Sequence, residues 1–254
     1  MQELFSVANK VALVTGGSRG IGRMIAEGFV RAGARVYISA RKAEACEATA
    51  AELAKIGTCN AIPADLSSEA EARRLAAELG EREPMLHVLV NNAGANWGAP
   101  YEEYPDSAWD KVLAVNVKAV FHLTRALTPR LEAAASDADP ARVINIGSID
   151  GIQVPALETY AYSASKAAVH HMTHVLARRL APKRITVNAV APGPFESKMM
   201  AATLERFGDS IAASCPLGRI GTPEDMAGVA IYLASRAGAY VTGVVIPVDG
   251  GIRA

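Results

Sequence analysis

Short apolar runs rich in β-branched residues alternate along this chain with longer segments of helical period. Seven runs are expected to be strands: Val11–Thr15, Arg35–Ser39, Cys59–Pro63, Leu86–Val90, Arg142–Gly147, Ile185–Val190 and Val244–Val248. Most are apolar on both faces, which suits parallel strands covered by helices on each side. The alternation predicts an α/β fold of the Rossmann type: a doubly wound, seven-stranded parallel sheet flanked by helices on both faces.

The segments between these runs carry a helical pattern. They are Gly20–Ala32, Ala43–Ile56, Ser68–Arg82, Asp106–Ala134, Thr159–Ala181 and Pro223–Ala234. In the first, Ile21, Ile25 and Phe29 lie on one stripe, as an amphipathic helix requires. No repeat or interdomain linker is apparent, so residues 1–254 are expected to form a single domain. The least regular stretch, Pro192–Pro216, follows the carboxyl end of a strand, where ligands bind in this architecture, and predicts a mobile substrate lid at about 193–216.

Composition excludes several classes of function. The chain has 26 Lys and Arg against 26 Asp and Glu, and a nucleic acid or an anionic membrane as main partner would require a basic excess. No apolar run is long enough to span a bilayer, and residues 1–10 do not resemble a signal peptide. The three cysteines, Cys46, Cys59 and Cys215, show no CxxC spacing, which favours idle thiols in a reducing compartment. A cytoplasmic protein is expected.

The first strand leads directly into a glycine-rich loop, and a helix follows. The loop reads Gly16-Gly17-Ser18-Arg19-Gly20-Ile21-Gly22. Its glycines permit a tight turn, close approach of a ligand to the backbone and close packing of the helix on the strand. The backbone N–H groups and the positive end of the helix then bind a pyrophosphate. This context predicts a dinucleotide site formed by Gly16, Ser18, Arg19, Gly20, Ile21 and Gly22.

The end of the second predicted strand distinguishes NAD from NADP. NAD-binding sites carry an acid there, which binds the ribose 2′-hydroxyl. Here the sequence is Ser39-Ala40-Arg41-Lys42. Arg41 can bind a 2′-phosphate through two N–H groups, and Arg19 is expected to face the same phosphate. The predicted cofactor is therefore NADP(H), with Lys42 facing solvent.

Ser148 follows the fifth predicted strand, and Tyr162 and Lys166 come next at i and i+4 of a predicted helix. A phenol with a pKa of about 10 exchanges protons poorly at neutral pH, and a shift of three units requires about 4 kcal/mol. A cation about 4 Å away, in an effective dielectric of about 20, supplies that amount. Lys166, together with an oxidised nicotinamide ring, is expected to lower the pKa of Tyr162 and so make it the proton donor and acceptor of a hydride-transfer reaction.

These residues form part of an ordered set. The set comprises Thr15-Gly16-x-x-x-Gly20-x-Gly22, Asn91-Asn92-Ala93-Gly94, Asn116, Ser148, Tyr162-x-x-x-Lys166 and Pro192-Gly193. Over essentially its whole length the chain resembles the short-chain dehydrogenase/reductase family. The resemblance implies that Tyr162 is the general acid in reduction, that Lys166 also holds the nicotinamide ribose and that Ser148 hydrogen-bonds the substrate oxygen. It further implies that Asn116 anchors a water of a proton relay.

The resemblance also implies further cofactor contacts. Asn92, Ala93 and Gly94 correspond to the turn beside the cofactor ribose, Asp65 and Leu66 to adenine contacts, and Pro192, Gly193 and Phe195 to the segment over the nicotinamide. Ser197 stands where the family commonly has Thr, so a hydroxyl is retained. Tyr160 is no rival to Tyr162, because Ala164 and not lysine follows four residues later. Family members pair through their two long helices and last strand, which implies a homotetramer or homodimer.

Within the family, the chain resembles bacterial 3-oxoacyl thioester reductases of the rhamnolipid-biosynthesis type, in residues 39–41, 141–148 and 192–199. That resemblance implies NADPH-dependent reduction of a 3-oxoacyl thioester, free or on an acyl carrier protein, to the 3-hydroxy product. A group of apolar side chains near the expected site either packs in the core or lines a substrate tunnel: Trp97, Met199, Met200, Leu204 and Phe207.

Alternative interpretations remain open at this stage. One is an NADP(H)-dependent reductase or dehydrogenase of a small ketone, quinone, sugar or secondary alcohol, because fold and catalytic set do not choose a substrate. Another is a non-catalytic NADP(H) sensor, although such a protein has no need of the full Asn, Ser, Tyr and Lys set. His170 and His174 lie at i and i+4, but no third ligand is apparent, so interface or surface packing is expected and no metal.

Overall fold

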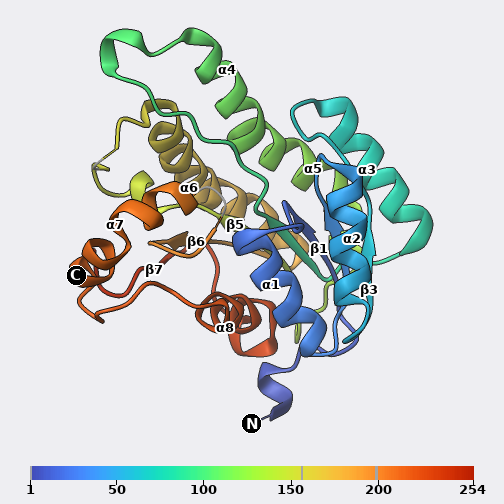
Figure 1. The fold of residues 1–254 in the computed structure, drawn as a ribbon. Helices are drawn as coiled ribbons and strands as arrows, with labels where there is room; N and C mark the ends of the chain where they lie inside the picture. Colours follow the sequence, from blue (N-terminus) through green and yellow to red (C-terminus); the bar gives the residue numbers. More distant parts are fainter. Residues whose placement is uncertain (1, 156, 198–199) are drawn as a thin grey trace.

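A computed structural model describes residues 2–155, 157–197 and 200–254, with the side chains of residues 2 and 201–204 left out of the description. Its centre is a single parallel sheet of seven strands in the order β3-β2-β1-β4-β5-β6-β7 (Figure 1). The strands are β1 Val11–Thr15, β2 Arg35–Ser39, β3 Cys59–Ala61, β4 Val88–Asn91, β5 Ala141–Ile146, β6 Ile185–Pro192 and β7 Val245–Val248. The predicted fold class is confirmed, and each predicted strand overlaps an observed one.

Helices cover both faces of the sheet (Figure 1). They are α1 Gly20–Arg31, α2 Ala43–Leu53, α3 Glu69–Arg82, α4 Asp106–Leu113, α5 Ala119–Ala134, α6 Tyr160–Leu180, α7 Ala201–Ser214 and α8 Pro223–Ala234. Short 3₁₀ turns occur at Gln2–Phe5, Tyr101–Glu103, Ile149–Gly151, Ala181–Lys183 and Arg236–Gly238.

Alternate residues of the strands feed two separate cores. Ala12 and Val14 of β1 pack with α1, α2 and α8, whereas Val11 and Leu13 pack with α3, α5 and α6. This division follows from the pleat, since successive side chains of a strand point to opposite faces. Apolar residues on both faces of a strand therefore require helices on both sides, as the sequence predicts.

Two helical segments differ from the sequence prediction. The predicted helix Asp106–Ala134 is interrupted by a π-helical turn at Ala114–Lys118, which carries Asn116; such turns often mark functional sites. The predicted irregular stretch Pro192–Pro216 contains α7. Gly208 and the preceding Pro-Gly-Pro run mask the helical pattern in the sequence, because both residue types weaken a helix assignment.

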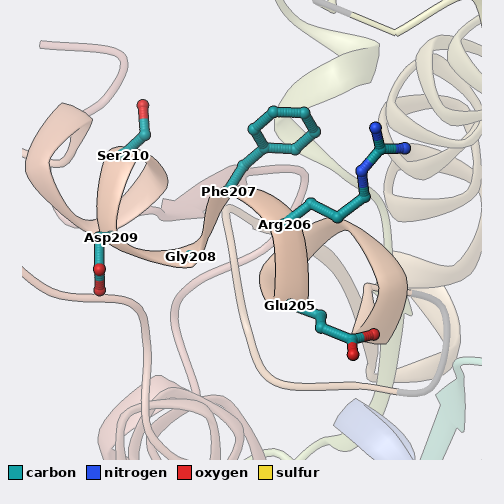
Figure 2. A pocket seen from close by; sticks show the side chains of 6 residues that line it. All are labelled: Glu205, Arg206, Phe207, Gly208, Asp209 and Ser210. Atoms are coloured by element: carbon teal, nitrogen blue, oxygen red, sulfur yellow. The ribbon is translucent and has the colours of Figure 1, made fainter.

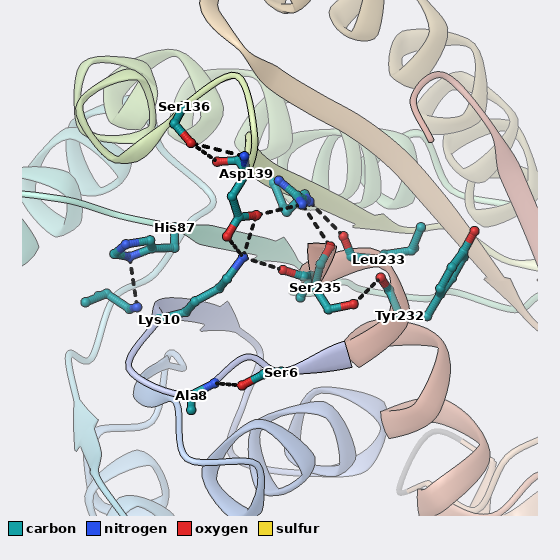
Figure 3. A network of polar contacts seen from close by, with 12 residues as sticks. Ser6, Ala8, Lys10, His87, Ser136, Asp139, Tyr232, Leu233 and Ser235 are labelled. Carbon is teal, nitrogen blue, oxygen red and sulfur yellow. Dashed lines mark hydrogen bonds and ion pairs between the residues drawn. The ribbon is translucent and has the colours of Figure 1, made fainter. Parts of the chain in front are cut away.

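A buried polar network lies at the amino-terminal edge of the sheet (Figure 3). The Lys10 ammonium donates to Asp139 Oδ1 at 2.8 Å and to the Ala234 carbonyl at 3.0 Å. The Arg142 guanidinium, 1% exposed, donates to Asp139 at 2.9 Å and to the carbonyl oxygens of Leu233 and Ser235. Two cations thus bind one carboxylate and the last carbonyls of α8, where the helix dipole favours positive charge.

Two further findings concern features expected from the sequence. Among the described residues, no helix combines the length and the apolar character that crossing a bilayer requires. Cys46, Cys59 and Cys215 are free thiols and all three are buried. Burial raises the pKa of Cys46 to about 11 and that of Cys59 to about 12, so neither forms the reactive thiolate at neutral pH.

Candidate active site

The loops that carry the predicted site residues meet at the carboxyl edge of the sheet. Strands β1, β4, β5 and β6 are consecutive neighbours, and each runs in the same direction. The segments that end or follow them therefore lie side by side: residues 16–22, 92–95, 147–151 and 192–195. The topology brings together motifs that are far apart in the sequence, as a doubly wound sheet does at its ligand-binding edge.

The glycine loop has the backbone that a phosphate site needs. Gly16 and Gly20 have φ of +64° and +52°, the left-handed region that side chains disfavour. A Cβ on Gly22 would lie 2.4 Å from the Gly16 carbonyl oxygen, so only glycine allows this packing of α1 on the loop. Arg19, the N-cap residue, makes no side-chain capping bond. The first N–H groups of α1 are therefore left for an anion.

Thr15 joins the glycine loop to the loop after β4. Its hydroxyl accepts the N–H groups of Asn92 at 2.9 Å and Ala93 at 3.0 Å, and donates to the Val90 carbonyl at 3.2 Å. The Asn92 amide donates back to the Thr15 carbonyl at 2.8 Å. The turn containing Asn92, Ala93 and Gly94 is thereby fixed against the phosphate loop.

The two arginines that were predicted to select NADP emerge from backbone segments that are bonded together. The Gly17 N–H donates to the Ser39 carbonyl at 3.2 Å, and Arg19 and Arg41 each follow two residues later. Both side chains are exposed, and neither forms an ion pair within the described residues. The Ser39 hydroxyl beside them is buried and has no hydrogen-bond partner in the described chain. This arrangement fits a phosphorylated ribose.

The predicted adenine contacts differ in what they can offer. Asp65 is half-buried, and its carboxylate accepts the Ser67 N–H at 3.1 Å. Leu66 is buried in the core beside α3, so its side chain is not available and only its backbone can contact a cofactor.

Tyr162, Lys166 and Ser148 come together as predicted. Tyr162 and Lys166 lie one turn apart on α6, and the Lys166 Nζ is 5.4 Å from the centre of the Tyr162 ring. This ammonium is buried and donates to the Ile146 carbonyl at 2.7 Å. The Ser148 Oγ accepts the Asp150 N–H at 3.1 Å, which leaves the hydroxyl proton to be donated. Ser148 also lies close enough to Tyr162 to lower the pKa of its phenol.

Burial dominates the electrostatics of Tyr162 and Lys166. Burial raises the pKa of Tyr162 to about 12, opposed by the hydrogen bond from Ser148 and assisted by the charge of Asp150. Burial lowers the pKa of Lys166 to about 8, while Asp150 acts in the opposite direction. The expected lowering of the Tyr162 pKa by Lys166 together with an oxidised nicotinamide ring stays a prediction. At neutral pH the phenol is protonated, which is the form a general acid needs.

Asn116 supports the loop above the site. Its Oδ1 accepts the Ala95 N–H at 2.8 Å, and its Nδ2 donates to the Ala95 carbonyl at 3.0 Å and to the Ser165 Oγ at 2.9 Å. Both amide protons and one acceptor position of the side chain are therefore engaged by protein partners. Its expected role as a water anchor stays a prediction.

The segment after β6 contributes both to the core and to the site. Gly193 is held by its N–H, which donates to the Val248 carbonyl at 2.9 Å. The Phe195 side chain is 2% exposed and packs on Gly221, where a Cβ would lie 2.3 Å from the ring. Any contact of Phe195 with a cofactor must therefore come from its backbone. Ser197 lies beside the phosphate loop, since a Cβ on Gly20 would lie 3.2 Å from the Ser197 Cβ.

The predicted substrate residues are not core residues where the structure describes them. Trp97 and Phe207 are exposed, by 37% and 53%, and Met200 is half-buried. Met199 lies outside the described residues, as does the side chain of Leu204. Figure 2 shows Phe207 and Arg206 on one side of α7, with Glu205 and Asp209 on the other, around a hollow that residues 205–210 line. Because this hollow is formed by α7 alone, it is a surface feature distinct from the catalytic centre.

Sequence reasoning missed two exposed apolar residues between Ser148 and Tyr162. Val154 and Leu157 are 93% and 55% exposed in the loop between Ser148 and α6. This loop is bound to the one that carries Trp97, because the Ala99 N–H donates to the Glu158 carbonyl at 3.3 Å. The available signal in the sequence was the occurrence of valine and leucine in the segment that joins Ser148 to Tyr162.

Of the two histidines on α6, His174 is a surface residue as expected and His170 is not. His174 is exposed and binds the Gly243 carbonyl through Nδ1 at 2.7 Å. His170, predicted as an interface or surface residue, is buried and accepts the Ser148 N–H at 3.4 Å. The available signal was spacing: residues 162, 166 and 170 share one helix face. Within the described residues, no three His, Cys, Asp or Glu side chains form a metal-binding cluster.

Comparisons with known proteins agree with this geometry. The sequence profile of the family described as enoyl-(acyl carrier protein) reductase matches residues 16–253. The rhamnolipids biosynthesis 3-oxoacyl-[acyl-carrier-protein] reductase of Pseudomonas aeruginosa is 54% identical over 255 residues, covering all of both chains. The solved structure of the Pseudomonas aeruginosa RhlG/NADP active-site complex superposes with a TM-score of 0.96 at 54% identity, covering 99% of each chain. The 5-keto-D-gluconate 5-reductase of Escherichia coli is 33% identical, covering 99% of this chain and 98% of the relative.

Proposed function

The chain belongs to the short-chain dehydrogenase/reductase family, and we propose that it reduces the ketone of a 3-oxoacyl thioester to the 3-hydroxy product. It is an NADP(H)-dependent oxidoreductase of CH–OH and C=O groups. The observation that carries the reaction class is the assembly of Tyr162, the buried Lys166 and Ser148 at the edge of the sheet that bears the glycine loop.

The described residues fit NADPH. The open first turn of α1 and the glycines at 16, 20 and 22 would hold the pyrophosphate, and Arg19 and Arg41 the 2′-phosphate. Lys166 and the turn at residues 92–94 would hold the nicotinamide half. When bound, NADPH supplies the hydride that is added to the carbonyl carbon.

The residues of the chain supply the proton and the orientation. Tyr162 donates its phenolic proton to the carbonyl oxygen as negative charge develops there. Ser148 donates a hydrogen bond to the same oxygen, because its Oγ already accepts from the Asp150 N–H. Lys166, with a pKa of about 8, remains mostly charged at neutral pH and stabilises the phenolate that forms on Tyr162.

Exposed apolar side chains on two loops of the site support an acyl substrate. Trp97, Val154 and Leu157 are exposed on segments that follow the carboxyl ends of β4 and β5, and the Ala99 N–H joins these segments by donating to the Glu158 carbonyl. An apolar chain would bury such side chains, which otherwise cost free energy in contact with water. The Pseudomonas aeruginosa relative is named for the same reaction on an acyl carrier protein. We propose an acyl-thioester substrate, free or carried by that protein.

The alternative substrate is a sugar acid or another small ketone. The named activity of the Escherichia coli relative supports it, because that chain is also related along its whole length. The exposed apolar side chains of Trp97, Val154 and Leu157 favour the acyl substrate over this one. The non-catalytic alternative has no support, since Asn116, Ser148, Tyr162 and Lys166 are all present and assembled.

Kinetics on a series of 3-oxoacyl thioesters from four to twelve carbons tests the substrate. Each buried methylene contributes roughly 0.8 kcal/mol, so kcat/KM should rise several-fold per two-carbon extension until the acyl site is full. Met200→Asp should flatten this dependence more than it harms the four-carbon substrate. Ile56→Asp, at an exposed apolar position after α2, is the control and should leave the series unchanged. Turnover of a sugar acid or small diketone, but of no thioester, would refute the acyl substrate and leave the carbonyl reductase.

We also propose how the protein works as a whole. Residues 1–254 act as one domain, and the segment at about 193–216, which includes α7, acts as a mobile lid. The enzyme is a homotetramer, or at least a homodimer: Phe121 of α5 and Val175 of α6 are exposed, and β7 is an edge strand. Light scattering at micromolar concentration should exclude the monomer mass of 26.6 kDa. Three free thiols support a cytoplasmic location.

A further inference from the structure

His170 lies on the face of α6 that carries the catalytic pair. It follows Lys166 by one turn and Tyr162 by two, and its side chain is buried, with the residue 7% exposed. The ring does not reach the reacting groups directly. It contacts the backbone of the segment that carries Ser148.

The ring binds the first residue of the turn at 148–151, where its Nε2 accepts the Ser148 N–H at 3.4 Å. Since Nε2 is an acceptor, the proton of a neutral ring must be on Nδ1. The turn is closed in addition by the Gly151 N–H, which donates to the Ser148 carbonyl at 3.0 Å.

Gly147 makes room for this ring. A Cβ on Gly147 would lie 2.0 Å from the His170 Nε2 and 2.6 Å from its Cδ2. The φ of Gly147 is not in the left-handed region, so the backbone conformation itself does not require glycine. Glycine is needed here for space, and the space is filled by an imidazole.

The ring is held in its neutral form. Burial lowers the pKa of His170 to about 4, and the positive charges of Lys166 and, to a smaller extent, His174 act in the same direction, while the backbone of Gly151 opposes them. A protonated ring would carry a hydrogen on Nε2 facing the Ser148 N–H, and the acceptor would be lost. At neutral pH the ring therefore keeps the acceptor that the turn needs.

We propose that His170 is a positioning residue for reduction: it fixes the turn at 148–151 and thereby aims the Ser148 hydroxyl at Tyr162 and the substrate oxygen. The Ser148 Oγ takes its orientation from the Asp150 N–H inside this turn. If the turn opens, the Ser148 Oγ no longer accepts the Asp150 N–H. The orientation in which the hydroxyl proton points to Tyr162 and the substrate is then lost. The proposal rests on the proposed function as a carbonyl reductase, but not on the identity of its substrate.

The test is a double-mutant cycle between His170 and Ser148. His170→Leu removes the acceptor at similar volume, and His170→Gln restores an acceptor near the position of Nε2. With NADPH and any ketone that the wild type reduces, His170→Leu should lower kcat about 10-fold or more, as loss of an orienting partner does, with the KM for NADPH within twofold. His170→Gln should recover most of this loss. His171→Leu, an exposed neighbour on the same helix, should have wild-type kinetics.

The decisive comparison is made in a Ser148→Ala background. If His170 acts through the Ser148 hydroxyl, adding His170→Leu there should change kcat less than twofold. A full, multiplicative loss in that background would overturn the proposal, as would a wild-type kcat for His170→Leu. Wild-type NADPH affinity, measured by fluorescence, shows that a variant is folded. Gly147→Ala tests the same turn from the other side, because the added carbon displaces the His170 ring, and it should lower kcat as His170→Leu does. If the wild type reduces no thioester, but the double-mutant cycle gives the expected result with a small ketone, only the acyl substrate is refuted.

Discussion

Arg41→Asp should reverse the cofactor preference. Arg19 and Arg41 are exposed, unpaired within the described residues, and joined through the bond from the Gly17 N–H to the Ser39 carbonyl. A hydrogen bond to a charged group contributes roughly 1.5–3 kcal/mol. Loss of Arg41 should therefore lower kcat/KM for NADPH about 10- to 150-fold, at about 1.4 kcal/mol per factor of ten. The new carboxylate repels the 2′-phosphate and can accept a hydrogen bond from the 2′-hydroxyl of NADH.

The assay measures kcat/KM for NADPH and NADH at fixed ionic strength, with Lys42→Asp as the matched control. Lys42 is adjacent and exposed, and its replacement changes the net charge equally. Only a direct contact separates the two variants, because long-range attraction acts on both and is screened by salt. Equal losses in both variants, or a parallel loss for NADH, would refute a direct contact between Arg41 and the phosphate. If the wild type has equal kcat/KM for NADPH and NADH, the proposed preference for NADPH is refuted.

Three further predictions concern the catalytic acid and the stability of the fold. Tyr162→Phe should lower kcat at least about 100-fold while NADPH binding, followed by fluorescence, is retained; a kcat above a tenth of wild type would contradict general acid catalysis. Asp139→Asn should cost about 3 kcal/mol in urea unfolding at fixed protein concentration, because it leaves two buried cations unpaired, whereas Asp137→Asn, at a 91% exposed position, should cost less than about 1 kcal/mol. Because the folded pKa of His170 lies below its usual value, the wild type should lose up to about 3 kcal/mol of unfolding free energy as pH falls from 6.5 to 4, and His170→Gln should show a shallower loss.

The parts of the fold that depend on periodicity could be predicted from the sequence. Residues of β1 that are apolar on both faces require helices on both sides, and the glycines at 16, 20 and 22 have meaning only between a strand and a helix. The pair formed by Tyr162 and Lys166 follows from helix geometry alone. In each case the information is local or repeats at a fixed interval.

The parts that depend on burial could not be predicted. The pKa of Tyr162 is set mainly by desolvation, which the residue spacing does not reveal. Phe195 and Leu66 match family positions, but their side chains are committed to the core. Helix α7 was missed because Gly208 and nearby prolines weaken its pattern, whereas tertiary packing overrides such local preferences.

The packing of His170 against Gly147 constrains how this active site can diverge. A side chain at residue 147 would place a carbon 2.0 Å from the imidazole, so the ring would have to move away from its present position. Replacement of the histidine before the glycine is therefore the less disruptive order of change. The same alanine at 147 is then harmful in one genetic background and tolerated in another, and the two positions are expected to vary together among descendants of this sequence.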